Sequence, residues 1–517
     1  MVLGRFRTAF ANCYKDRVLF ILPVLLLLLS TSCATFTEDT PQRVYLEKSA
    51  VPELPITPDE AQHLQALATY TPFMEALLVQ LISIDSVNQL LVEGSNDIFF
   101  AAKDVLQSSG AEVELIPVQT PHGRVYNLIA VVEGDHPGPT MLFSGHMDTV
   151  PYQSELWDAG IQPLSGVRIG DRIYGRGALD MKGGVAVMMT VMAYLAESQA
   201  LSAGRLMLLL TPDEETGGAY GTAVIARDYP DILHSDMTII AEPTQFFPLA
   251  TPAVAYGEKG VLWVRFLFTG DAGHSSSSGI TAGSLDSALR FVSQLESFTF
   301  PGSSDIKNSR VIRELRKRFT FGDLLRLRRD FSDGASDLSL FSQSTLSVTD
   351  IATAPRTIAN QMPASTEVIV DFRLMPGVTI PMMTHQIVSF MTDLGFAVEL
   401  CDEFRVHYDD QKPDAPDVRI EVMFAKEGSQ ESLDSAETEF ITQVFEAVYR
   451  TQPLYMLSPG FTDAGNLRSS GLRNIYIIGP KGDGAHAVHE YVTASSMESL
   501  AAFYLTAALR FLQADGP

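Results

Sequence analysis

The sequence predicts an α/β fold in which a larger mixed-sheet domain is interrupted by a smaller domain of βαββαβ order. Between about residues 110 and 250, short apolar runs alternate with helical stretches. Runs that are apolar at nearly every position are typical of strands buried on both faces of a sheet. Near residue 252 the pattern changes to longer strands, and after about 432 the first pattern resumes. A chain of 517 residues is also too long for one compact core.

The elements of the larger domain come from two parts of the chain, 59–251 and 431–517. The first part is expected to begin with helices over residues 59–110. It then supplies strands at Asn127–Val132, Met141–Ser144, Leu206–Leu210 and Met237–Ile240, with a helix at Met181–Ser198. The second part is expected to supply helix Ala436–Arg450, strand Ile475–Ile478 and helix Ser495–Leu512.

The interrupting domain is predicted to span residues 252–430. Its elements in chain order are strand Val261–Thr269, helix Leu285–Leu295, strands Thr345–Thr349 and Thr366–Leu374, helix Pro381–Leu394 and strand Arg419–Phe424. This order indicates a ferredoxin-like domain with an open antiparallel sheet. Between its first helix and second strand lies a basic insertion, residues 301–343, which is either a solvated surface helix or a basic face for membrane phosphates or an acidic partner.

Residues 1–33 have the pattern of a targeting segment. A basic front is followed by the apolar run Val18–Leu29 and by small residues that end at Cys33. About a dozen apolar residues are typical of a signal peptide and are short for a spanning helix. The end of the segment resembles a bacterial lipoprotein signal, so we expect an extracytoplasmic protein anchored in the membrane through a lipidated Cys33. A cleaved secretory signal and an uncleaved anchor are the alternatives. Residues 34–58 carry four prolines and are predicted to form a tether.

The charge and cysteine content exclude some classes of function. The net charge of −25 argues against binding to nucleic acid, whose phosphates require a Lys/Arg face. Cys401 is the only cysteine after the targeting segment, so the body of the protein has no internal disulfide.

Five short segments place metal-binding side chains just after a predicted strand or at the start of a helix. They contain His146 with Asp148, then Asp180, the pair Glu214 and Glu215, Glu242, and His486. Ligand sites in open α/β sheets collect at the carboxyl ends of the strands. Histidine and carboxylate ligands without thiolate suit zinc, and five of them can hold two ions that share one carboxylate. Asp148 is two residues from His146, so in extended chain it faces the same way and can fix the imidazole tautomer.

Other hydrolase and cofactor motifs are missing from the sequence. There is no His-Glu-x-x-His and no Gly-x-Ser-x-Gly. Gly175-Arg-Gly177 begins like a dinucleotide fingerprint, but Asp180 stands where the third glycine belongs. One acidic pair after a strand is usually a cap or a solvated turn, whereas five such segments together favour a metal site.

The five motifs, in this order, resemble those of the dizinc exopeptidases and deacylases, a family that includes glutamate carboxypeptidase, aminoacylase, acetylornithine deacetylase and succinyl-diaminopimelate desuccinylase. The resemblance covers residues 60–512. It implies a zinc domain interrupted by a lid that also forms a homodimer. It further implies two Zn²⁺ ions per subunit, with Co²⁺ or Mn²⁺ as substitutes.

The resemblance also implies a role for each motif residue. One ion would be bound by His146 and Glu242, the other by Glu215 and His486, and Asp180 would bridge the two. Glu214 resembles the general base of the family, and Asp148 the carboxylate behind His146.

Three residues of the lid match family positions. His274, in Gly-His-Ser-Ser, resembles the histidine that reaches the partner subunit's site and stabilises the oxyanion. Asn360, in Ala-Asn-Gln-Met-Pro, and Arg373, in Asp-Phe-Arg-Leu-Met-Pro-Gly, resemble substrate-binding residues, and Arg373 would bind a carboxylate.

The chain departs from the family pattern at two places. Where the family often has Gly-Gly-Thr-Asp-Ala-Arg, this chain has Gly-Phe461-Thr-Asp-Ala-Gly465, which changes one side of the specificity pocket. His489 stands where Asn or Asp is common, and it is an alternative metal ligand.

These residues predict zinc-dependent hydrolysis of an amide bond in a small substrate with a free carboxylate, as in a carboxypeptidase or dipeptidase. The alternative within the same chemistry is an N-acyl-amino-acid deacylase. A different class is a non-catalytic metal- or peptide-binding lipoprotein that has kept the fold. Glu214 separates these classes, because a binding protein has no need of a base beside five ligands. The expected partners are a peptide or N-acyl amino acid, a second copy of the chain and, through the N-terminus, a membrane.

Overall fold

The computed structural model describes residues 55–88, 96–230, 232–245, 249–277, 283–302, 343–354, 359–401 and 416–513. The targeting segment 1–33, most of the tether 34–58 and nearly all of the basic insertion 301–343 lie outside the described residues. The predictions made for these three segments therefore stay predictions.

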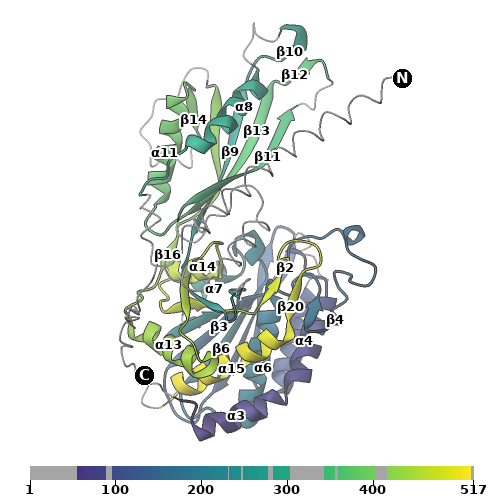
Figure 1. The fold of residues 1–517 in the computed structure, drawn as a ribbon, viewed down its shortest axis with the longest axis vertical. Coiled ribbons are helices and arrows are strands. Elements are labelled where there is room, and N and C mark those ends of the chain that lie inside the picture. The colour runs from purple at the N-terminus through teal and green to yellow at the C-terminus, as the bar shows by residue number, and fades with distance from the viewer. Residues whose placement is uncertain are drawn as a thin grey trace, which may run out of the picture. The chain divides into compact units, whose positions relative to one another are not determined.

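The larger domain is built on a nine-stranded mixed sheet (Figure 1). Its strands, in spatial order, are β1 (Glu112–Thr120), β2 (Gly123–Glu133), β6 (Arg205–Thr211), β3 (Thr140–His146), β7 (Met237–Ile240), β18 (Ile475–Ile477), β8 (Ala253–Glu258) and β16 (Ser429–Gln430), and β17 (Leu454–Ser458) also pairs with β8. β3 is parallel to β6 and β7, and β7 is parallel to β18. The carboxyl ends of these four strands therefore lie at one edge of the sheet.

The helices of the larger domain are α3 (Pro58–Ala68), α4 (Thr71–Ser83), α5 (Asp97–Ser108), α6 (Lys182–Ser198), α7 (Thr222–Asp228), α13 (Ala436–Tyr449), α14 (Asp463–Ser469) and α15 (Ala494–Phe511). α6 is apolar on every side because it packs against β3 and β6 and also contacts α4 and α15. α15 in turn packs against α13, and both come from the part of the chain after residue 430. The two separated parts of the chain thus share one hydrophobic core.

A small four-stranded sheet joins two distant parts of the sequence. Its order is β19 (Gly482–Asp483), β20 (Tyr491–Thr493), β5 (Arg172–Tyr174) and β4 (Val167–Ile169). The antiparallel pairing of β20 with β5 brings the segment that leads to Asp180 beside the segment that contains His486. The sequence patterns did not predict this sheet, because its strands are only two or three residues long.

The interrupting domain has a five-stranded sheet of order β11-β13-β9-β15-β14. Its strands are β9 (Gly260–Thr269), β11 (Thr345–Ala354), β13 (Ser365–Leu374), β14 (Val398–Leu400) and β15 (Val418–Lys426). Helices α8 (Ser284–Gln294) and α11 (Ile380–Asp393) cover one face, as Figure 1 shows, and bury the alternate side chains Leu262, Val264, Phe266 and Phe268. The fold class predicted from the sequence is confirmed, and all elements of the predicted βαββαβ order are present, but β14 is an additional strand that was not predicted. We call this domain the lid and its other face the open face.

Four strands of the larger sheet were not predicted, namely β1, β8, β16 and β17. β1 alternates polar and apolar residues and contains Pro117, as expected of a strand that pairs on one side only. β8 and β17 are short and lie beside the entry to the lid, where periodicity gives little signal.

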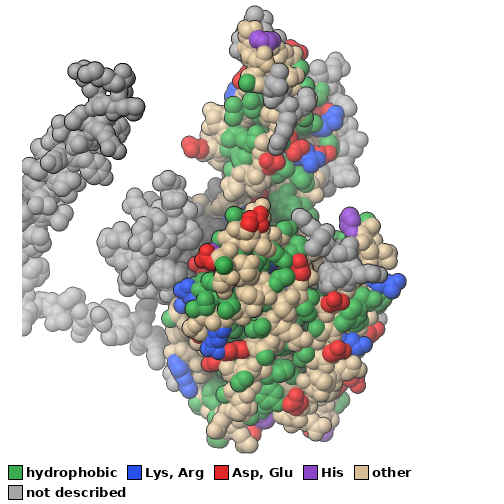
Figure 2. All heavy atoms as spheres, turned by 90° about the vertical axis from the view of Figure 1, so that its right-hand side faces the viewer, with side chains coloured by type: hydrophobic (Ala, Val, Ile, Leu, Met, Phe, Trp, Pro, Cys, Tyr) green, Lys and Arg blue, Asp and Glu red, His purple; other side chains and the backbone are tan. Residues whose placement is uncertain are grey.

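Within the described residues, no single helix is long and apolar enough to cross a membrane, and only α3 and α4 together, bent by 51°, meet that test of length and composition. On the face drawn in Figure 2, acidic and basic side chains are interspersed between apolar ones.

Candidate metal centre

Four of the predicted site residues lie at the carboxyl edge of the nine-stranded sheet. His146 is the last residue of β3, and Glu242 follows β7 by two residues. Glu214 and Glu215 begin a short 3-10 helix, Glu214–Thr216, just after β6. Because β3, β6 and β7 are mutually parallel, the three loops meet at one place.

The other two predicted ligands reach this place through the small four-stranded sheet. Asp180 lies between β5 and α6, and His486 lies in the loop between β19 and β20. The pairing of β5 with β20 holds these two segments side by side. All five predicted ligands are thereby brought together from segments more than 300 residues apart in the chain.

The five side chains form two triads that share Asp180. Asp180 Oδ1 lies 3.1 Å from His146 Nε2, and Asp180 Oδ2 lies 3.2 Å from His486 Nε2. Glu242 Oε1 is 3.3 Å from His146 Nε2, and Glu215 Oε2 is 3.1 Å from His486 Nε2. Donor atoms around one tetrahedral zinc, each at about 2.0–2.1 Å, stand about 3.3 Å apart. The spacing therefore fits two zinc ions with Asp180 between them.

Mutual distances alone also permit a different grouping. His146 lies within 4.8 Å of ligand atoms of both Glu214 and Glu242, and also of Asp180 with Glu215. Glu214 Oε2 is 3.9 Å from His146 Nε2, farther than Glu242 Oε1 at 3.3 Å, so we favour Glu242 as the ligand. Glu215 Oε1 is buried without a hydrogen-bond partner, which is costly unless a cation satisfies it.

The titration of these groups shows how the cluster is balanced without ions. Burial raises the pKa of Glu242 to about 8, helped by the charge of Asp180. Burial likewise raises the pKa of Glu214 well above its usual range. Hydrogen bonds to Asp180 and Glu215 raise the pKa of His486 to about 10. The metal-free cluster therefore holds extra protons, which metal ions would displace, because ligands must be deprotonated to bind them.

Asp148 contacts His146 and also holds the loop that carries Glu214 and Glu215. Its main-chain carbonyl oxygen lies 3.0 Å from His146 Nδ1, closer than its carboxylate oxygen Oδ1 at 3.4 Å. The carboxylate accepts hydrogen bonds from the main-chain N–H groups of Glu214 and Glu215, both at 3.1 Å, and from Asn88 Nδ2 at 2.6 Å. Asp148 thus fixes the loop that carries Glu214, a contact that the His-x-Asp spacing alone does not show.

Glu490 is a structural element of the site that the sequence patterns did not reveal. This carboxylate is 1% exposed, and Oε2 accepts hydrogen bonds from Arg176 Nη1 at 2.6 Å and Gly177 N at 3.0 Å. Oε1 accepts from the main-chain N–H groups of Leu179 at 2.9 Å and Asp180 at 3.0 Å. Glu490 therefore holds the Asp180 loop against the segment of His486. Its position in the His-Glu-Tyr-Val stretch is the only sequence signal for this role.

His489 contacts Asp158 and Trp157, which are not among the predicted ligands. Its Nε2 accepts a hydrogen bond from the main-chain N–H of Asp158 at 3.0 Å, and its ring packs edge-on against Trp157. The alternative of His489 as a metal ligand therefore finds no support in the geometry.

The lid residues are not gathered at one place. β10 (Gly273–His274) pairs with β12 (Gln361–Met362), and His274 Nε2 lies 3.3 Å from Asn360 Nδ2. Arg373 stands near the opposite end of β13, eight residues from Ser365, which is about 26 Å of extended strand. Its Nε and Nη2 both lie 3.0 Å from Asp371 Oδ2. The structure thus brings His274 and Asn360 together and places Arg373 elsewhere.

Phe461 and Gly465, the two departures from the family pattern, are coupled in space. A Cβ atom at Gly465 would lie 2.5 Å from Phe461 Cε2 and 2.5 Å from Glu258 Oε1. Glu258 is held in place because its Oε2 accepts hydrogen bonds from Thr462 N at 2.9 Å and Thr462 Oγ1 at 2.6 Å. A side chain at position 465 would therefore require Phe461 and Glu258 to move.

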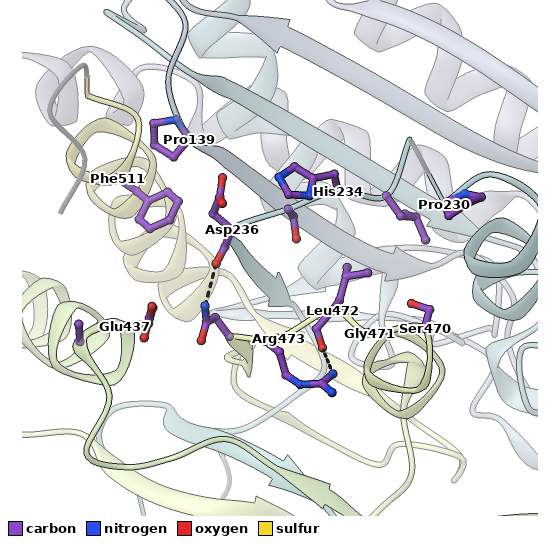
Figure 3. Close-up of a pocket in the computed structure, with 14 residues that line it drawn as sticks. Pro139, Pro230, His234, Asp236, Glu437, Ser470, Gly471, Leu472, Arg473 and Phe511 are labelled. Carbon is purple, nitrogen blue, oxygen red and sulfur yellow. Dashed lines mark hydrogen bonds between the residues drawn. The ribbon is translucent and has the colours of Figure 1, made fainter.

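A surface cavity of about 590 Å³ lies at the opposite, amino-terminal edge of the large sheet (Figure 3). Asp236 and Asn474, which line it, directly precede β7 and β18. They are hydrogen-bonded to each other, with Asn474 Nδ2 3.0 Å from Asp236 O. None of the predicted ligands lines this cavity, so the metal chemistry belongs to the other edge.

The chain is similar to curated deacylases over part of its length. It is 29% identical to succinyl-diaminopimelate desuccinylase of Novosphingobium aromaticivorans over 188 residues, 36% of this chain and 48% of that protein. It is 33% identical to acetylornithine deacetylase of Photorhabdus laumondii over 208 residues, 40% of this chain and 50% of that protein. The chain thus matches about half the length of these relatives.

Solved peptidases share the fold over most of the chain. Human carnosine dipeptidase 1 superposes with a TM-score of 0.68 at 16% identity, covering 88% of this chain and 100% of that one. The metallo-carboxypeptidase Sso-CP2 of Sulfolobus solfataricus superposes with a TM-score of 0.66 at 19% identity, covering 84% and 98%. The sequence model of one family, described as Peptidase family M20/M25/M40, matches residues 142–510, well over half of the chain. Together with the two triads at the sheet edge, this match shows that the chain belongs to the M20/M25/M40 peptidase family.

Proposed function

We propose that the protein is a two-metal hydrolase that cleaves an amide or peptide bond in a small substrate with a free carboxylate, as a dipeptidase or carboxypeptidase does. The observation that carries this proposal is Glu214, a largely buried carboxylate that lies beside the two triads but farther from His146 Nε2 than Glu242 does. A protein that only binds metal has no use for a fourth carboxylate beside the three carboxylate ligands Asp180, Glu215 and Glu242. A base beside two metal ions is what hydrolysis requires.

The donor set fits zinc, with His146, Glu242 and Asp180 around one ion and His486, Glu215 and Asp180 around the other. Zinc bound there would polarise the scissile carbonyl and lower the pKa of a water molecule to about 7. Co²⁺ and Mn²⁺ are proposed as substitutes, because they accept the same ligand types.

Glu214 moves the proton in this proposal. Its burial raises its pKa, which makes its carboxylate a strong proton acceptor. It takes the proton from the attacking water as the water oxygen bonds to the carbonyl carbon. It then gives that proton to the leaving nitrogen as the carbon–nitrogen bond breaks. Asp148 keeps Glu214 in place through the main-chain hydrogen bond of 3.1 Å.

The lid is proposed to complete the site through a homodimer. His274 and Asn360 lie on the order of 25 Å along the lid sheet from Arg373, so both groups cannot act on one small substrate in the same subunit. In a dimer, His274 of one subunit would stabilise the oxyanion in the other subunit's site, and Arg373 would bind the substrate carboxylate in its own.

The test is a hydrolysis panel of dipeptides and N-acyl amino acids with the zinc-loaded protein and its Glu214→Gln variant. We expect the variant to lose about 100- to 10,000-fold in turnover, the usual range for a general base, while it keeps both metals. Metal content is measured by mass spectrometry. Near-normal turnover by Glu214→Gln would overturn the role of the base, and a zinc-loaded protein inert toward the whole panel would favour a binding protein.

The same panel decides between the two amide hydrolases. The curated relatives named desuccinylase and deacetylase favour an N-acyl-amino-acid deacylase as the second candidate. A preference for N-acyl amino acids over dipeptides would establish that the protein is a deacylase.

We also propose that the protein is extracytoplasmic and anchored through Cys33, on the sequence pattern of residues 1–33 alone. A Cys33→Ser variant should be released from membranes or remain unprocessed, as judged by fractionation and N-terminal mass. Unchanged membrane association with an intact N-terminus would favour an uncleaved anchor.

A further inference from the structure

Lys259 carries a buried ammonium group without a counter-ion. It is the single residue between β8 and β9, and its side chain is 0% exposed. Its Nζ atom makes no hydrogen bond to any described residue. A buried charge is costly unless it is paired, and methionine would fill a similar volume without that cost. The position is therefore better explained by a ligand than by packing.

The charges around Lys259 are those of an anion-binding site. Burial lowers the pKa of Lys259 to about 8, and the one other contribution comes from the positive charge of Arg373. Val261, two residues after Lys259 in the chain, is paired with Arg373 on β13 and with Lys426 on β15. Arg373 and Lys426 therefore stand on either side of β9 on the open face. Asp371 is the acidic group beside them, and its Oδ2 already accepts both bonds from Arg373. Three basic side chains, those of Lys259, Arg373 and Lys426, thus lie at a junction whose acidic neighbours include Asp371 and Glu258.

This cationic cluster lies next to the contact between the lid and the metal loop. One step further along the open face, the rings of Trp263 and Phe424 stack with centroids 5.1 Å apart. A Cβ atom at Gly217 would lie 2.7 Å from Phe424 Cε2, so this ring packs directly on the residue that ends the Glu214–Thr216 turn. This contact joins the strands that carry the cluster to the loop that carries Glu214 and Glu215.

We propose that Lys259 and Arg373 together form the receptor for the carboxylate of the substrate, with Lys259 as its buried specificity residue. Arg373, whose side chain is 29% exposed, offers the accessible donors, and Lys259 supplies an unneutralised charge behind them. This inference rests on the proposed function and narrows it. The substrate carries its carboxylate close to the scissile amide, and the corresponding C-terminal amide is rejected.

Direct binding tests the receptor without relying on turnover. The probes are N-acetylglycine and N-acetylglycinamide, the smallest such pair, titrated by calorimetry into the zinc-loaded Glu214→Gln protein. We expect the carboxylate to bind at least tenfold more tightly than the amide. Adding Lys259→Met should reduce that ratio to within about threefold, and adding Lys259→Arg should preserve it. The metal ligands are the same in all these proteins, so the difference reports the cation.

Arg265 provides the matched control. Arg265 lies on β9, four residues after Val261 and on the same face of the sheet. Its charge is already balanced by Glu367 at 2.9 Å and Glu421 at 2.7 Å. Adding Arg265→Met should leave the carboxylate preference unchanged.

A measurement without any change at position 259 guards against a variant that fails to fold. Above pH 8 Lys259 loses its charge, so the carboxylate preference should fall, while the Lys259→Arg protein keeps it. The other charged groups at this junction are Arg373, Asp371, Lys426, Glu427, Glu258 and, beside Glu258, Arg468. Full preference in folded Lys259→Met, a flat pH response, or no binding of either probe would overturn the receptor. An inert hydrolysis panel with an intact carboxylate preference would instead overturn the proposed function alone.

Discussion

The metal centre and the lid differ in how their charges are balanced within one chain. At the metal centre, each histidine ligand lies 3.1–3.3 Å from two carboxylates, and these mutual contacts hold the group together although His486 itself is half exposed. In the lid, His274 is exposed, and the buried cation Lys259 has no carboxylate of its own. All five predicted metal ligands therefore come from one chain and balance one another, whereas the lid groups are proposed to act on a substrate or in a second subunit's site.

The largest effect is expected at the residue shared by both triads. Asp180→Ala removes a ligand from each ion and leaves His146 and His486 facing each other without a carboxylate between them. We expect both metals to be lost at micromolar free zinc and turnover to fall below detection. Metal per subunit, measured after gel filtration, checks this. Full occupancy of both sites would show that Asp180 is not the bridge.

Exchange of subunits tests whether the lid acts on the partner. His274→Ala should lose about 100- to 1,000-fold in turnover, as expected for one oxyanion donor. Mixed with Glu214→Gln under exchange conditions, it should form heterodimers in which one composite site is intact. Turnover should then recover toward half of the normal value per heterodimer.

Heterodimer formation must be verified by native mass spectrometry in the same samples. Exchange without recovery, or a fully active monomer, would show that His274 serves its own chain or none.

Glu490→Gln tests how far the metal centre depends on its surroundings. Glutamine has nearly the same shape, but one of its two terminal groups is an NH₂ donor. That donor would face either the N–H groups of Leu179 and Asp180 or those of Arg176 and Gly177, all of which need an acceptor. We expect zinc affinity to fall about 10- to 100-fold, the usual cost of losing a partner of the ligand shell. Chelator competition measures this.

The effect of Glu490→Gln should be on affinity and not on chemistry. Saturating zinc should therefore restore most of the turnover number. Unchanged zinc affinity would show that the Asp180 loop holds its shape without Glu490.

The sequence predicted the metal ligands better than it predicted the residues that hold those ligands in place. His146, Glu215 and Glu242 are recognisable because a metal-binding residue type follows a buried strand, and both signals are local. Glu490 acts through main-chain N–H groups more than 300 residues away, which leave no trace in residue type. The coupling of Phe461 with Gly465 is equally invisible, because it depends on a contact of 2.5 Å that only the folded chain creates.

The sequence predicted the order of helices and strands in the lid but not which of its charged side chains lie together. Its βαββαβ pattern follows from periodicity, which the pleat imposes on each strand separately. That Arg373 and Lys259 share a neighbourhood depends on the register of β9 with β13, and register is a tertiary property.

The smallest expected effect concerns Glu258, next to Lys259 in the chain, and is a dependence of stability on pH. Burial raises the pKa of Glu258 to about 7 from its ordinary value of 4.5, and Oε1 has no hydrogen-bond partner among the described residues. The folded protein therefore holds a proton that the unfolded chain releases between those two values. Its contribution to stability is fully present below pH 4.5, declines as the pH rises, and is lost above pH 7. At 1.36 kcal/mol per unit, the loss is at most on the order of 3 kcal/mol.

Glu258→Gln removes this titration and leaves the other buried acids in place. Relative to the natural protein, the variant should gain up to a few kcal/mol in the free energy of unfolding between pH 5 and 7.5, as measured by urea denaturation of the zinc-loaded proteins. Parallel stability curves would mean that Glu258 stays ionised in the fold. It would then have to draw on the nearby charge of Arg468, which already lowers its pKa. In that case Glu258 would be an ionised carboxylate paired with a nearby cation, as the carboxylates of the metal centre are paired with histidines. Lys259 would then be the only one of these two neighbouring residues whose charge is left unpaired for the proposed substrate carboxylate.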